Sequence, residues 1–65
     1  AAVRRDAVRA LTDELGPLAE GIAMRIERAR SFDELRPLLQ NAAQLVDNAR
    51  GRTAAQVFRN RFLRD

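Results

Sequence analysis

The sequence has 65 residues, among them no Cys, His, Lys, Tyr or Trp, and its 12 arginines and 9 acidic residues give a net charge of +3. It therefore lacks the usual transition-metal ligands and the usual nucleophiles and general bases, so we expect no metal, no cofactor and no enzymatic activity. Apolar runs are only a few residues long, which excludes a membrane span, and no signal-peptide core is present, so we expect a cytoplasmic protein.

Size and composition predict an all-α protein. Ala and Leu, the best helix formers, account for 12 and 8 residues. We expect residues 1–65 to form a single domain, a small antiparallel bundle or hairpin of three to four helices. A core of this size supplies only about 3–5 kcal/mol, and the chain begins with Ala-Ala-Val rather than Met, so we expect a fragment of a longer protein or a subunit of an assembly.

The first half predicts an amphipathic helical segment, because apolar residues recur every three or four positions. The segment keeps its phase through Gly16 and Pro17, which allows two interpretations. Gly16 ends one helix and Pro17 opens the next, or residues 2–30 form one helix bent at Pro17. The unbroken phase favours the bent helix. Its apolar stripe comprises Val3, Ala7, Leu11, Leu15, Leu18, Ile22, Ile26 and Ala29.

The middle of the chain carries the clearest amphipathic helix. Ser31 and Glu34 form a capping-box pattern, in which each side chain accepts a hydrogen bond from a free backbone N–H. Pro37 follows in the second turn, so either the helix bends there or residues 31–35 form a separate turn. The apolar stripe of this helix comprises Leu35, Leu38, Leu39, Ala42, Leu45, Val46 and Ala49.

A final helix is expected from residue 54 to about residue 64. Gly51 predicts the left-handed residue that ends the preceding helix. Thr53 and Gln56 repeat the capping-box pattern at the start of the final helix. The face that suits burial against the preceding helix comprises Ala54, Ala55, Phe58 and Phe62.

Positive charge is concentrated at the C-terminal end, where residues 50–65 hold five arginines against Asp65 alone, a balance of +4. The exclusive use of Arg is typical of a GC-rich bacterial genome, although the planar guanidinium also suits phosphate or carboxylate. The last three arginines point in different directions on a helical wheel, which favours a solvated surface and leaves nucleic-acid binding as the alternative. The candidate nucleic-acid contacts are Arg50, Arg52, Arg59, Arg61 and Arg64.

The function that this pattern favours is a helical protein–protein interaction or assembly module. Apolar stripes on helices too short to be stable alone favour packing against another protein chain or a second copy. Val57 and Leu63 lie off the main apolar face of the final helix, which indicates more than one packing neighbour. The candidate partner-binding residues are Leu18, Ile22, Ile26, Val57, Phe62 and Leu63.

Overall fold

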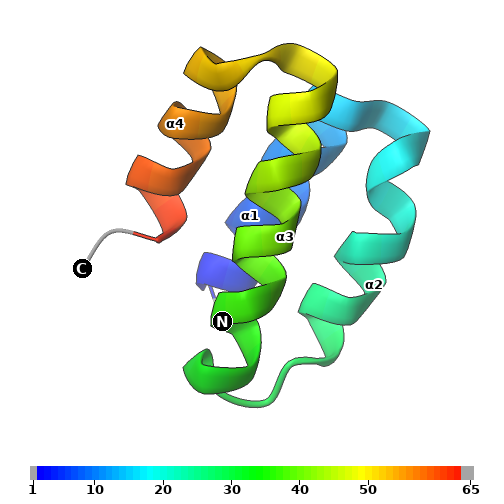
Figure 1. Cartoon of the computed structure of the whole chain (residues 1–65). Helices are drawn as coiled ribbons and strands as arrows, with labels where there is room; N and C mark the ends of the chain where they lie inside the picture. The colour runs from blue at the N-terminus through cyan, green and yellow to red at the C-terminus, as the bar shows by residue number, and fades with distance from the viewer. Residues whose placement is uncertain (1, 64–65) are drawn as a thin grey trace.

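The computed structural model describes residues 2–63, which form helices and no strand (Figure 1). Of these residues 92% are helical, which confirms the prediction of a small all-α fold. The chain runs through α1 (Ala2–Leu15), the 3₁₀ helix η1 (Gly16–Ala19), α2 (Glu20–Arg28), α3 (Phe32–Arg50) and α4 (Arg52–Phe62).

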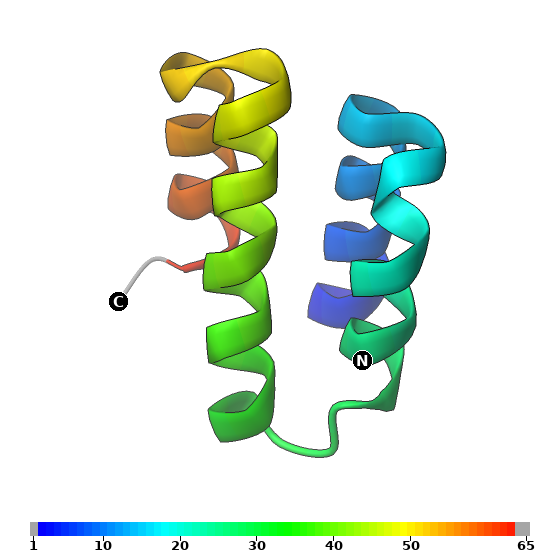
Figure 2. The same ribbon diagram turned by 45° about the vertical axis from the view of Figure 1, so that its right-hand side comes forward.

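The helices form two antiparallel hairpins that pack against each other (Figure 2). One hairpin contains α1 and α2, and the other contains α3 and α4. The two hairpin turns lie at the same end of the bundle, and the short α2–α3 connection lies at the opposite end. Helix α1 contacts the other three helices, whereas α2 and α4 share no contact within residues 2–63. Helices α2 and α4 therefore lie on opposite sides of the pair formed by α1 and α3.

The junction between α1 and α2 is a reversal of the chain. Gly16 has a φ of 58°, the left-handed conformation that ends a helix, and Pro17 lies at the start of η1. The guanidinium of Arg4 donates a hydrogen bond to the backbone carbonyl of Ala29, which joins the start of α1 to the end of α2. The preference for one bent helix over residues 2–30 was wrong, because both arms of a hairpin can turn the same apolar stripe toward one core.

Helix α3 begins as the capping-box pattern predicts. The hydroxyl of Ser31 accepts a hydrogen bond from the Glu34 N–H at 3.2 Å, and the Glu34 carboxylate accepts one from the Arg30 N–H at 3.1 Å. Pro37 lies inside α3 on its exposed side. The helix continues through this position, so residues 31–35 do not form a separate turn.

Gly51 separates α3 from α4, as the sequence predicts. Its N–H donates to the Asp47 carbonyl at 2.9 Å, and its own carbonyl accepts from the Ala55 N–H at 3.2 Å. The predicted capping box of Thr53 and Gln56 is wrong. Helix α4 already begins at Arg52 without a side-chain cap, and the Gln56 amide instead donates to the Asn60 side-chain oxygen at 3.2 Å.

Replacing Gly51 with Ala is expected to lower the free energy of unfolding by about 1–3 kcal/mol, because its φ of 99° and ψ of 171° are almost exclusive to glycine. A Cβ at this position meets no atom within 4 Å, so the cost comes from the backbone alone. Urea denaturation followed by circular dichroism measures the change. Gly21, an exposed glycine inside α2, is the matched control: Gly21→Ala is expected to stabilise the chain slightly, because Ala is the better helix former. Equal effects at the two glycines would contradict this account of the turn.

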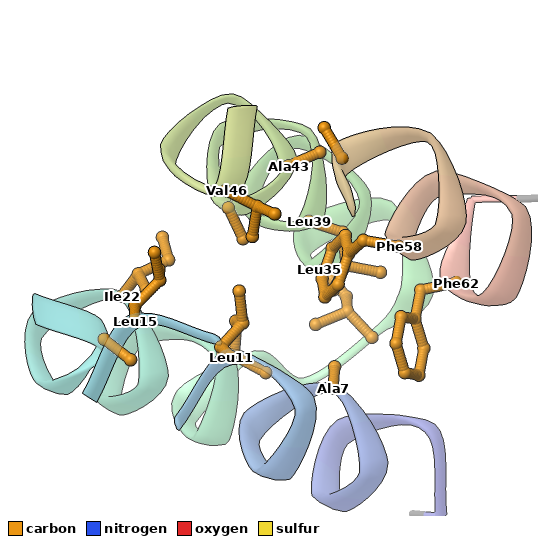
Figure 3. Close-up of a cluster of buried hydrophobic side chains, with 14 of the residues drawn as sticks. Ala7, Leu11, Leu15, Ile22, Leu35, Leu39, Ala43, Val46, Phe58 and Phe62 are labelled. Atoms are coloured by element: carbon orange, nitrogen blue, oxygen red, sulfur yellow. The ribbon is translucent and has the colours of Figure 1, made fainter. Parts of the chain in front are cut away.

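The core lies between the two hairpins and consists only of apolar side chains (Figure 3). In Figure 3, Leu11 and Ile22 project from one hairpin toward Leu39 and Phe58 of the other. The predicted inward face of α4 is confirmed, since Ala55, Phe58 and Phe62 are buried and Ala54 is half-buried against the core. The buried residues are Ala7, Leu11, Leu15, Ala19, Ile22, Ile26, Ala29, Leu35, Leu39, Ala42, Ala43, Val46, Ala55, Phe58 and Phe62.

Candidate interaction surfaces

The six predicted partner-binding residues do not share one surface. Ile22, Ile26 and Phe62 are buried in the chain's own core, where they hold the two hairpins together. The stripe that predicted an interface is thus largely used by the fold itself, and Ile22 alone of these three also lines a surface hollow.

The other three predicted residues remain at the surface. Leu63 is half-buried and packs against the core beside the end of α4. Leu18 is 74% exposed and Val57 is 54% exposed, so these two side chains present large aliphatic groups to solvent. They lie on different parts of the bundle, Leu18 in η1 and Val57 in α4, and so they belong to separate surfaces.

Leu18 borders a hollow of about 310 Å³ at one end of the bundle. Across it lies Leu45 of α3, which is 39% exposed although the sequence places it on an apolar stripe. The exposed lining is mostly apolar, and the lining residues are Leu15, Leu18, Leu45, Asn48 and Ala49.

A second hollow continues from the first between α2 and α3, and Leu45 lines both. We call the two together the α2–α3 groove. The groove carries a single charged side chain, Arg25, in a protein in which 32% of the residues are charged. Charge depletion is typical of the centre of protein interfaces. The second hollow is lined by Gly21, Ile22, Arg25, Asn41, Gln44 and Leu45.

The sequence does not predict this groove as a unit. The residues of the α3 wall could have been found, because Leu45 and Ala49 lie at one edge of the apolar stripe of α3 and Asn41 borders the same edge. The residues of the other wall could not have been found from the sequence, because Leu18 lies within the predicted buried stripe of the first half. Only the packing of α2 on α3 brings Leu18 opposite Leu45 and Arg25 near Asn41.

Further exposed apolar residues lie away from the groove. Val3 and Phe32 border a hollow of about 240 Å³ at the opposite end of the bundle, next to Arg4 and Arg30. Met24 lies on α2, beside a hollow of about 530 Å³ between α1 and α2. Each of these places combines its apolar side chains with two charged ones, whereas the α2–α3 groove has one.

The arginines proposed for nucleic-acid binding are dispersed over the C-terminal hairpin. Arg50 forms an ion pair with Glu14 of α1, with 3.3 Å between Nε and Oε2. The Arg61 guanidinium lies 4.8 Å from the centre of the Phe62 ring, within the range of a cation–π contact. Arg52 is exposed at the start of α4 and Arg59 is half-buried.

These arginines do not form one stripe. Arg59 and Arg61 are two positions apart on α4, which places them about 200° apart around the helix. Arg64, the last of the set, lies outside the described residues. A helix that tracks phosphates gathers its cations on one side, so α4 by itself does not present such a stripe.

The chemistry available elsewhere is limited. Within residues 2–63, no three His, Cys, Asp or Glu side chains come together in a way that could hold a metal ion. None of the described helices is both long enough and apolar enough to span a bilayer.

Comparison with known proteins gives no relative for this chain. No protein-family model matches it, and neither a curated protein nor a solved structure shows significant similarity to it. The function is therefore inferred from the surfaces described above.

Proposed function

We propose that this chain is a non-enzymatic helical interaction module, which presents apolar helix surfaces to another protein chain or to its own copy. The observation that carries the proposal is the α2–α3 groove, where Leu18 and Leu45 are exposed beside a hollow in a surface with a single charge. The proposal includes the cytoplasmic location and the non-catalytic role expected from the sequence.

The energetics of the exposed side chains support this function. Burying one Leu side chain contributes about 1.5–3 kcal/mol, so covering Leu18 and Leu45 is favourable for any partner that excludes water from the groove. Neither side chain is needed to fill the core, since the buried cluster contains neither of them. Val57 adds a smaller apolar contact on α4.

The experiment that tests the proposal is affinity purification with the chain and its Leu18→Glu variant from extracts of the cells that produce it. A partner chain, or the chain's own copy, is expected to be retained by the natural protein and lost by the variant, because a carboxylate in the groove is costly to bury. Circular dichroism of both proteins checks that the fold is unchanged. Val57→Glu is the matched control on a separate surface. Retention of the same proteins by all three chains would contradict the proposal.

The second candidate function is nucleic-acid binding through the arginines at residues 50–64. The observation that favours it is the exposure of Arg52 and Arg61 on one short hairpin, next to Arg50. The ion pair of Arg50 with Glu14 already neutralises one of these cations.

Salt dependence separates the two functions. Association through the groove is expected to stay constant or to strengthen in sulfate, because apolar burial is favoured by excluded salts. Binding to a labelled DNA duplex through phosphates weakens by about 0.9 log unit per contacted phosphate for each log unit of salt. Sedimentation velocity and fluorescence anisotropy, each over a range of salt, measure these responses. Steep loss of a measured protein association in salt would contradict an apolar interface.

A further inference from the structure

We propose that the α2–α3 groove is a homodimer interface, in which a second copy of this chain packs groove to groove about a two-fold axis parallel to the helices. The inference rests on the proposed function, because it names the partner of the same surface.

The two walls of the groove match each other. One wall comes from η1 and α2, the other from α3, and the two run antiparallel. Leu18 and Leu45 are level because they line the same hollow, and Arg25 is level with Asn41 because they line the next one. A two-fold axis parallel to the helices keeps each residue at the same height along the bundle. It places the η1–α2 wall of one copy against the α3 wall of the other. Leu18 of each copy then lies against Leu45 of the other, which buries four leucines around the axis.

The same arrangement provides a hydrogen-bond acceptor for Arg25, the single charged side chain of the groove. The guanidinium of Arg25 makes no hydrogen bond or ion pair with any residue in the described range 2–63. In the dimer its guanidinium faces Asn41 of the other copy, whose side-chain oxygen accepts hydrogen bonds that a guanidinium can donate. The two Arg25 side chains lie on opposite sides of the axis, so the like charges do not meet. The groove is self-complementary, as an isologous interface requires.

The alternative two-fold axis, perpendicular to the helices, is disfavoured by the same residues. It packs the η1–α2 walls of the two copies against each other in antiparallel orientation. Leu18 of one copy then lies against Arg25 of the other. A guanidinium then loses water against aliphatic side chains and gains no acceptor, which is unfavourable. The position of the charge therefore selects the parallel axis.

The size of the chain allows an interface of ordinary area. A stable interface buries about 800 Å² on each partner. The accessible surface of the chain is 4650 Å², so such an interface takes about one sixth of it. One long side of a four-helix bundle can supply this share.

Cross-linking tests the arrangement directly, because the chain contains no cysteine of its own. Chains carrying Leu18→Cys are mixed with chains carrying Leu45→Cys and treated with a short bismaleimide. The mixture is expected to give several-fold more cross-linked dimer than either variant alone, since Leu18 faces Leu45 and not itself. A mixture of Leu18→Cys with Val57→Cys, whose substituted side chain is on α4, is the control. Equal yields in all mixtures, or the highest yield from Leu18→Cys with Arg25→Cys, would overturn the parallel arrangement.

Sedimentation equilibrium separates this inference from the function on which it rests. The natural chain is expected to dimerise between micromolar and millimolar concentration, and Leu18→Glu is expected to weaken the dimer at least tenfold, or about 1.4 kcal/mol. Val57→Glu is expected to leave it unchanged. A natural chain that stays monomeric throughout overturns the homodimer. If the purification still retains a different protein through Leu18, the proposed function stands without the homodimer, and if it retains none, both fail.

Discussion

Replacing Phe58 with Ala is expected to lower the free energy of unfolding by about 3–5 kcal/mol, the largest loss in this protein. Phe58 is buried between α4 and the rest of the core, and its ring centre lies 4.8 Å from that of Phe62 in a tilted arrangement. Truncation removes the ring contact and leaves a cavity that short helices cannot close without losing other contacts. A core of this size supplies about the same energy in total, so most molecules should be unfolded at room temperature.

The neighbouring Val57 provides the control for Phe58. It lies on the same helix but is mostly exposed, so Val57→Ala is expected to change the free energy of unfolding by less than about 0.5 kcal/mol. Far-UV circular dichroism during urea denaturation measures both variants. A loss below about 1 kcal/mol for Phe58→Ala would mean that α4 does not pack on the core as described.

Replacing Leu11 with Ala is expected to cost about 2–5 kcal/mol. Leu11 is fully buried, and its side chain projects from α1 toward α3 and α4 (Figure 3). Because α1 contacts both helices of the other hairpin, a cavity at this position weakens the packing of one hairpin on the other. The melting temperature and the urea midpoint are both expected to fall, without loss of helix in the molecules that remain folded.

Leu18→Ala is the matched control, because the same chemical change is made on the same predicted stripe. Leu18 is mostly exposed, so a change of less than about 0.5 kcal/mol is expected at protein concentrations where the chain is monomeric. Similar losses at Leu11 and Leu18 would show that both are core residues. That result would also remove the basis of the proposed interaction surface.

The packing of the four helices explains why the α2–α3 groove is exposed. Helix α4 packs on α3 and α1, and α2 packs on α1 and α3, but nothing in the described chain covers the outer side between α2 and α3. The apolar stripe of α3 is wider than the surface that α2 covers, so Leu45 remains exposed while Leu39 and Val46 are buried. A chain with an extra helix on this side would bury the groove internally.

The sequence by itself determined the features that depend on neighbouring residues. Ser31 and Glu34 mark the start of α3 because their side chains satisfy free backbone N–H groups within one turn. Gly51 marks its end because few other residues adopt the required backbone conformation. The inward face of α4 follows from the spacing of Phe58 and Phe62, which a helix places one above the other.

Only the tertiary structure decided how the first half folds and which apolar residues remain exposed. Periodicity gives the direction of a side chain around its own helix, but not the neighbour that it meets, so one bent helix and a hairpin shared the same pattern. The 3₁₀ turn also changes the phase, because three residues per turn rotate successive side chains by about 120° instead of about 100°. Ala19 is therefore buried where Leu18 was expected, and the larger side chain faces the groove.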